Sequence, residues 1–163
     1  MLHLSQTFKA AAVLGVASLA LAGCSLISSG DAKRDESGRP TETSVADAFK
    51  IKVGDCMAEP SSNEFQDVSI IPCDQSHDLE AFAAKKIVAD SYPGESEVQT
   101  QSEDYCGTEF AKFVGVPYDE STLDMTYFYP SSETWKQRDR EIMCLIGGPS
   151  GTSTKGTLKG AAK

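Results

Sequence analysis

Apolar and polar residues alternate in short stretches through the middle of the chain, which predicts β-strands. The stretch FKIKVGDCM, residues 49–57, alternates apolar residues with lysines and predicts a half-buried strand that ends in a turn at Gly54. A second strand is predicted over DVSIIPC, residues 67–73. Residues 79–88, LEAFAAKKIV, fit either a strand or a helix. We favour a strand, because they closely follow the previous strand and precede the turn cluster DSYPGE.

The period of the pattern then changes to that of a helix. Ser96 and Gln99 fit a capping box at its start, and Gly115 fits its end. One residue in four forms the inward stripe: Val98, Ser102, Cys106, Phe110 and Val114. Two more strands are predicted at residues 123–130 and 141–147. Together these elements predict an α+β fold, a small antiparallel sheet with one main helix packed on it.

The N-terminus has the pattern of an export signal. Residues 10–23 form an apolar run that is short for a membrane span and typical of a signal peptide. The run ends in LAGC, which resembles the lipobox of bacterial lipoproteins, although an ordinary secretory signal or an uncleaved anchor are the alternatives. The resemblance implies that residues 1–23 are cleaved and that Cys24 carries lipid. Two or more acyl chains hold a protein stably at a membrane without a span. We therefore expect a lipid-anchored protein on the extracytoplasmic face of the cell membrane.

Composition divides the rest of the chain into a tether and one domain. Residues 24–47 comprise Cys24 and a polar stretch that predicts a disordered tether, and residues 48–160 predict a single domain. The tail after Leu158 is predicted to fray. Loss of Lys9 with the signal leaves 14 basic and 24 acidic side chains, a formal net charge of −10. This charge argues against nucleic acid as a partner and against broad adhesion to anionic lipid headgroups.

Four cysteines remain after Cys24, and an even number in an exported domain predicts two disulfides. They are Cys56, Cys73, Cys106 and Cys144. Three pairings are possible, and we favour the sequence-local one, Cys56 with Cys73 and Cys106 with Cys144. The sequence has no CxxC motif and only one histidine after the signal, so thioredoxin-like redox chemistry and the usual zinc patterns are not indicated. We expect no metal and no cofactor.

Several short motifs occur in a fixed order along the domain. They are VGDC at 53–56, IPC and SHDLEAF within 71–82, YPG at 92–94, FVG at 113–115, Trp135 before DR and Cys144, and GTLKG at 156–160. In this order they resemble the septum-formation domain of actinobacterial envelope proteins. The resemblance implies an extracytoplasmic domain with paired cysteines and a link to cell division, but no defined biochemical activity. The family commonly has glycine where this chain has Arg138, and a positive φ there would make the turn costlier.

His77 is the centre of the candidate chemistry, because the other histidine, His3, lies in the signal. As a general base, it has acidic neighbours that include Glu80, but no GxSxG nucleophile motif accompanies it. As a metal ligand it lacks a second histidine, and a pH-sensing role would need a bistable surface. We favour a structural anchor, hydrogen-bonded to a backbone carbonyl or to Glu80 or Asp139. A strand would place His77 and Glu80 on opposite faces, and a helix would bring them together.

Trp135 with Arg138 and Arg140 forms the second candidate cluster. It could be a stacking surface for a glycan or a protein. We favour a core tryptophan with a neighbouring arginine that pairs with an acid such as Asp55 or Glu80.

The function that follows is that of a non-enzymatic, lipid-anchored envelope protein. We expect it to bind another envelope protein or peptidoglycan in septum formation or cell-wall processes. The alternatives are a cell-wall enzyme or accessory hydrolase centred on His77, and a lipoprotein that binds a small ligand or a metal.

Overall fold

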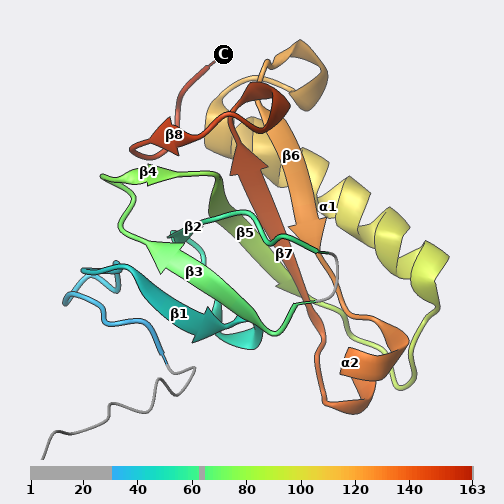
Figure 1. The fold of residues 1–163 in the computed structure, drawn as a ribbon. Helices are drawn as coiled ribbons and strands as arrows, with labels where there is room; N and C mark the ends of the chain where they lie inside the picture. The colour runs from blue at the N-terminus through green and yellow to red at the C-terminus, as the bar shows by residue number, and fades with distance from the viewer. Residues whose placement is uncertain (1–30, 63–64, 163) are drawn as a thin grey trace, which may run out of the picture.

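The fold is α+β, as predicted, and is built around one curled antiparallel sheet (Figure 1). The computed structural model describes residues 31–62 and 65–162. The sheet has six strands in the spatial order β1 (Ser44–Asp47), β3 (Asp67–Ile71), β2 (Cys56–Met57), β5 (Leu79–Lys86), β7 (Glu141–Gly147) and β6 (Asp124–Phe128). A separate small pair is formed by β4 (Ser76–His77) and β8 (Thr154–Lys155). The strands predicted near residues 67–73, 79–88, 123–130 and 141–147 are therefore confirmed.

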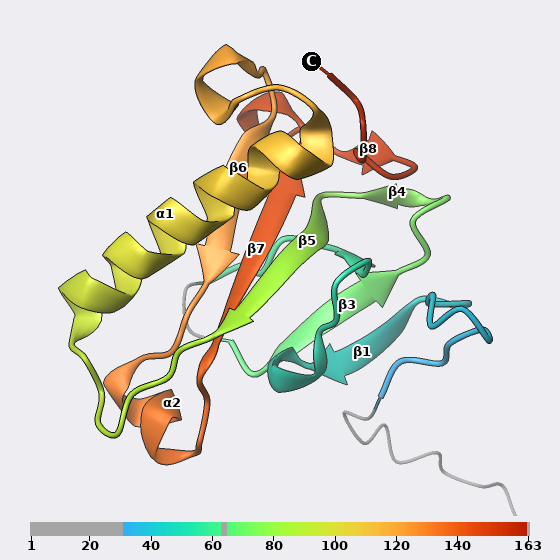
Figure 2. The ribbon, with the colours of Figure 1, turned by 180° about the vertical axis from the view of Figure 1, so that it is seen from behind.

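Helix α1 (Glu95–Val114) covers one face of the sheet (Figure 2). All five residues of the predicted stripe are buried, which confirms the four-residue period. The helix ends at Gly115, whose φ of 99° is the left-handed conformation expected of a C-terminal glycine. The predicted capping box is wrong. The N-cap is Gly94, two residues before Ser96, and no side chain caps the first turn.

Both predicted disulfides are present, with the favoured pairing. The bond between Cys106 and Cys144 joins α1 to β7 within the core beneath the helix. The bond between Cys56 and Cys73 joins β2 to the turn that follows β3. One disulfide thus fixes the helix to the middle of the sheet, and the other fixes β2 to the end of β3.

The inner side of the curl holds a second apolar core. Phe65, just before β3, packs against Phe128 of β6 with the rings tilted and their centroids 4.7 Å apart. This contact links the two halves of the sheet and closes the curl. Strand β7 is buried on both faces, which explains why its sequence, EIMCLIG, is a continuous apolar run. A bulge between Ala81 and Ala83 breaks the alternation of β5, so residues 79–88 lack a clear period.

The strand predicted over residues 49–57 is wrong. Residues Ala48–Lys50 form a short 3-10 helix, η1, and only the two-residue β2 follows. Of the apolar residues in the alternating stretch, Ile51 is buried, while Phe49 and Val53 are more than half exposed. The alternating pattern therefore does not mark a strand, because only Ile51 points into the core and it does so from a turn. The turn at Gly54 is confirmed, with a φ of 94°.

The tether boundary at residue 47 is also wrong, because part of that stretch belongs to the fold. Strand β1 pairs along its whole length with β3, and its Ala46 is buried. Further upstream, Ala32 is buried, and Arg34 forms an ion pair with the buried carboxylate of Asp55. The signal peptide, Cys24 and residues 25–30 lie outside the described residues. None of the helices in the described ranges is long and apolar enough to cross a membrane.

The chain ends in a segment that we call the C-terminal strap, residues 152–162. The strap passes β4 and then reaches the end of α1, where Gly160 N donates to Phe113 O (2.8 Å) and Ala162 N donates to Val114 O (3.0 Å). The predicted fraying after Leu158 is therefore wrong for the residues described here. These backbone bonds satisfy carbonyls that the last turn of a helix leaves without partners.

Candidate functional site

His77 is an internal anchor of the C-terminal strap. It ends β4, is 1% exposed, and lies opposite Thr154 in the β4–β8 pair. Its Nδ1 is 2.9 Å from Gln75 O, and its Nε2 is 3.2 Å from Thr154 Oγ1. Because a carbonyl oxygen can only accept, Nδ1 carries a proton, and in the neutral ring Nε2 then accepts from the threonine hydroxyl. The predicted hydrogen bond to a backbone carbonyl is confirmed, and both ring nitrogens are occupied.

Glu80 holds the same strap from the next strand. It lies in β5 and is 4% exposed. Its Oε1 accepts from Thr157 Oγ1 at 2.6 Å, and its Oε2 accepts from Leu158 N at 2.7 Å. A buried carboxylate that accepts from two donors is satisfied without a nearby cation. His77 and Glu80 thus bind different residues of one segment and are not aimed at a shared substrate position.

Asp78, between them, completes a set of contacts that we call the clasp. Its Oδ1 accepts from Ser153 Oγ at 2.7 Å, and its Oδ2 accepts from Glu59 N at 3.1 Å. The Ser153 hydroxyl contributes most to lowering the pKa of Asp78 below its ordinary value, and the Glu59 N–H adds to the effect. The clasp consists of His77, Asp78 and Glu80 with Ser153, Thr154, Thr157 and Leu158. Within the clasp, Glu80 of the SHDLEAF motif binds Thr157 and Leu158 of the GTLKG motif.

Trp135 is a core residue, as favoured from the sequence. It lies in the short helix α2 (Ser132–Lys136) and is 7% exposed. The Arg140 guanidinium stacks 3.5 Å from the centre of its ring, and Tyr92 contacts it edge-on. The prediction that an arginine here pairs with Asp55 or Glu80 is wrong. Arg140 instead donates to the carbonyl oxygens of Trp135 and Asp139.

Arg138 occupies the turn between α2 and β7 with a φ of 72°. This is the left-handed conformation that favours glycine, so the positive φ considered for the family's glycine is present at Arg138.

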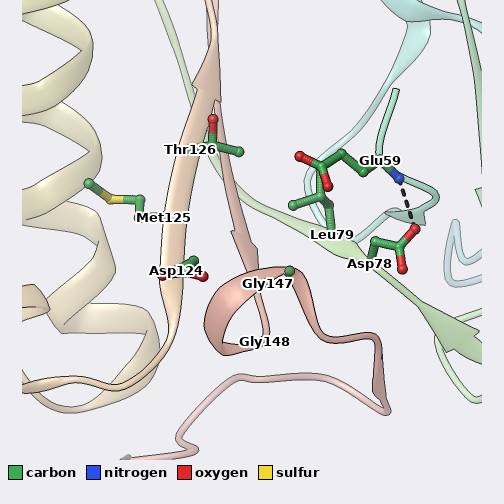
Figure 3. Close-up of a pocket in the computed structure, with 9 residues that line it drawn as sticks. Glu59, Asp78, Leu79, Asp124, Met125, Thr126, Gly147 and Gly148 are labelled. Carbon is green, nitrogen blue, oxygen red and sulfur yellow. Dashed lines mark hydrogen bonds between the residues drawn. The ribbon is translucent and has the colours of Figure 1, made fainter. Parts of the chain in front are cut away.

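A small pocket opens at the end of the sheet where β6, β7 and the start of β5 meet (Figure 3). Its volume is about 110 Å³. The acidic side chains that line it are Glu59, Asp78 and Asp124, from three separate segments. Leu79 and Thr126 complete the side-chain lining, and the remaining lining comes from Met125, Gly147, Gly148 and Gly151.

Two glycines border this pocket at points where the backbone segments approach closely. A Cβ atom at Gly147 would lie 2.7 Å from Asp78 O, and one at Gly148 would lie 2.2 Å from Thr152 O. Neither position can hold a larger residue without a backbone shift. The pocket is therefore bordered by closely packed backbone as well as by side chains.

The pocket carries negative charge without a matching cation. Among the residues that the structure describes, neither Glu59 nor Asp124 forms an ion pair. Asp78 has a lowered pKa, which keeps its carboxylate charged. In the described part of the chain, no group of three or more His, Cys, Asp or Glu is placed to hold a metal ion. An ammonium or guanidinium group has the charge that these carboxylates complement.

The sequence indicated acidic neighbours of His77 but did not predict this pocket. Glu59 follows β2, and Asp124 begins β6, so 65 positions separate them in the sequence. No local period connects such residues. The glycine pair at 147–148, directly after an apolar strand, is the one signal that could have indicated a close backbone approach.

Comparison with known proteins gives one finding. A family model described as septum formation matches residues 23–163, which is most of the chain. No curated protein and no solved structure matches the chain. The matched range includes both disulfides, the clasp and the acidic pocket. The chain belongs to the septum-formation family.

Proposed function

We propose that this protein is a lipid-anchored, extracytoplasmic binding module that serves septum formation by holding another envelope protein. Family membership relates the chain to septum formation. The observation that carries the proposal is the acidic pocket beside β6, because it is solvent-accessible and its charge is not neutralised by the fold.

The state of the other candidate residues supports binding over catalysis. A general base needs a free nitrogen or oxygen within reach of a substrate. His77 has both nitrogens engaged and is 1% exposed, and both carboxylate oxygens of Glu80 are engaged. Three of the side chains that line the pocket are carboxylates. No cysteine, lysine or histidine is among the lining residues. These features lend no support to a hydrolase centred on His77.

The position of the pocket favours an extended polypeptide as the ligand. Strand β6 pairs with β7 and lies at the edge of the described sheet. An extended segment can add to such an edge through main-chain hydrogen bonds, while side-chain pockets supply specificity. Asp124 and Thr126 of β6 line the pocket, so a lysine or arginine of an added strand would reach the carboxylates. We therefore propose that the partner presents an extended, basic segment.

Photocrosslinking in living cells tests this function. A photoreactive residue at Thr126, in the full-length protein, should capture a discrete protein, whereas the same residue at Thr108 on the exposed side of α1 should not. Replacing Glu59 with Gln and Asp124 with Asn should reduce capture at Thr126 by about tenfold or more, since each lost ion contact weakens binding by about 1 kcal/mol or more. The matched control is Asp104→Asn, which removes an exposed acid from α1.

The outcomes of that experiment separate the alternatives. A protein captured at Thr126 and lost in the pocket variant supports the proposal. Muropeptides captured at the same position would favour peptidoglycan as the partner instead. Capture that is absent at Thr126, or unchanged in the double variant, would refute the role given to the pocket.

A further inference from the structure

Two apolar side chains are exposed on one short loop. Phe49 is 54% exposed and Val53 is 53% exposed, while Ile51 between them is buried and holds the loop to the core. Lys50 and Lys52 are also exposed, so the loop presents lysines between apolar tips. We call residues 49–53 the contact loop. Single exposed apolar residues are common and need no explanation. This loop differs because it lies beside the N-terminal segment that leads to Cys24.

The N-terminal segment runs beside the contact loop. Asp31, the first described residue, has its Oδ1 3.7 Å from Lys50 Nζ. Three residues later, Arg34 donates to both carboxylate oxygens of Asp55, which also accepts from Lys52 N at 2.8 Å. Asp55 is 1% exposed, so this tie is internal to the fold. The segment that leads to Cys24 therefore leaves the domain next to the contact loop.

The length of the intervening chain sets how far the domain can stand from a lipid on Cys24. Six residues, 25–30, separate Cys24 from Asp31. Seven steps of extended chain span at most about 25 Å, whereas a tether that ran to residue 47 would reach about 80 Å. The contact loop is thus confined to the neighbourhood of the membrane surface. The orientation of the domain relative to the membrane then depends on which of its side chains gain free energy by leaving water.

We propose that the contact loop is the membrane-facing surface of this protein, with Phe49 and Val53 inserted among the lipid headgroups. This inference rests on the lipid anchor of the proposed function, and it adds the face that is turned to the bilayer. Apolar side chains stabilise such contact in proportion to the area they bury, and the stems of Lys50 and Lys52 reach toward the phosphates. The loop is too small for stable binding by itself, so it orients a domain that the lipid holds.

The proposed orientation leaves the acidic pocket free. The contact loop follows β1, at one edge of the sheet, and the pocket adjoins β6, at the other edge. Figures 1 and 2 both show these edges on different sides of the molecule. With the loop on the bilayer, the pocket faces the envelope space, where a protein partner can reach it.

Quenching of tryptophan fluorescence by brominated lipid tests the orientation. The lipidated full-length protein carrying Phe49→Trp is reconstituted in vesicles of phosphatidylethanolamine and phosphatidylglycerol, with and without dibrominated phosphatidylcholine. The matched control is Tyr118→Trp, at another exposed aromatic position, on η2 (Tyr118–Glu120). The signal of the buried Trp135 is subtracted with the wild-type protein. We expect brominated lipid to lower the fluorescence at position 49 at least twofold and to leave position 118 nearly unchanged.

A second readout distinguishes the ways in which the inference can fail. The mass of the N-terminal peptide reports whether Cys24 carries lipid. Lipidated protein without quenching at position 49, or with equal quenching at both positions, would overturn the proposed face and leave the anchor intact. An unmodified Cys24 would overturn the anchor and the face together. Urea unfolding in detergent verifies that both tryptophan variants keep the native fold.

Discussion

The ion pair between Arg34 and Asp55 gives the sharpest test of where the domain begins. The Asp55 side chain is 1% exposed and that of Arg34 is 13% exposed. Replacing Arg34 with Ala leaves a buried carboxylate without its cation, a change that typically costs about 3–5 kcal/mol. Asp55 keeps its bond to Lys52 N, so we expect the lower end, about 3 kcal/mol. In a domain of this size, that loss lowers Tm by roughly 10 °C.

The assay is urea unfolding of a chain that starts at residue 25, followed by circular dichroism at pH 7. The control is Lys33→Ala, one residue away, which breaks an exposed ion pair with Glu42. Exposed pairs contribute little to stability, so this variant should unfold close to the wild type. Combining Arg34→Ala with Asp55→Asn should show a coupling of about 2 kcal/mol. If the two alanine variants unfold alike, the segment before β1 does not contribute to the fold and our reasoning about it is refuted.

Three further predictions concern the clasp, one turn and pH. Glu80→Gln should lower the free energy of unfolding by about 2 kcal/mol, because it removes charge-assisted bonds to the C-terminal strap, whereas Thr157→Val should cost about 1 kcal/mol. Arg138→Gly should stabilise the protein by about 1 kcal/mol, because φ is 72° there. The native pKa of Asp78 is lowered from 3.8, mainly by Ser153, so Asp78 stabilises the fold above pH 4 and loses this effect as pH falls through the native pKa. Asp78→Asn should therefore lower Tm at pH 7, and this difference from the wild type should shrink as the pH falls below 4.

Each of these predictions has an outcome that contradicts it. Unchanged unfolding of Glu80→Gln would mean that the strap is held by other contacts. Gln137→Gly, at a φ of −89°, serves as the control for Arg138→Gly and should destabilise the protein. If both glycine variants destabilise, the turn is not strained by arginine. A Tm difference for Asp78→Asn that persists unchanged at pH 2 would show that charge is not its cause.

The sequence predicted those elements that have regular local patterns. The stripe of α1 repeats over the whole helix, so its buried face was predicted residue by residue. Strand β7 is apolar throughout because it is buried on both faces. The cysteine pairing followed from sequence proximity, and the turn at Arg138 followed from the family's glycine. In each case, one stretch of chain contains the information.

The elements that sequence reasoning missed depend on contacts between distant segments. Arg34 and Asp55 are 21 residues apart, and Glu80 and Thr157 are 77 apart, so no periodicity connects them. Strand β1 contributes only Ala46 as a fully buried side chain, and its polar neighbours resemble a linker. The strap is likewise polar, because it is fixed by hydrogen bonds more than by apolar area. Polar segments of this kind read as disordered until their partners are known.

The order of the disulfides along the chain has a consequence for how the protein matures. The first two cysteines of the domain, Cys56 and Cys73, bond to each other, and so do the last two, Cys106 and Cys144. A polypeptide that crosses a membrane from its N-terminus exposes Cys56 and Cys73 before the later two. An oxidant that acts as thiols emerge then meets only the native partner at each step. Refolding the reduced domain with its four cysteines offers three pairings at once, so oxidative refolding in a test tube should need an isomerase that the proposed vectorial export would not.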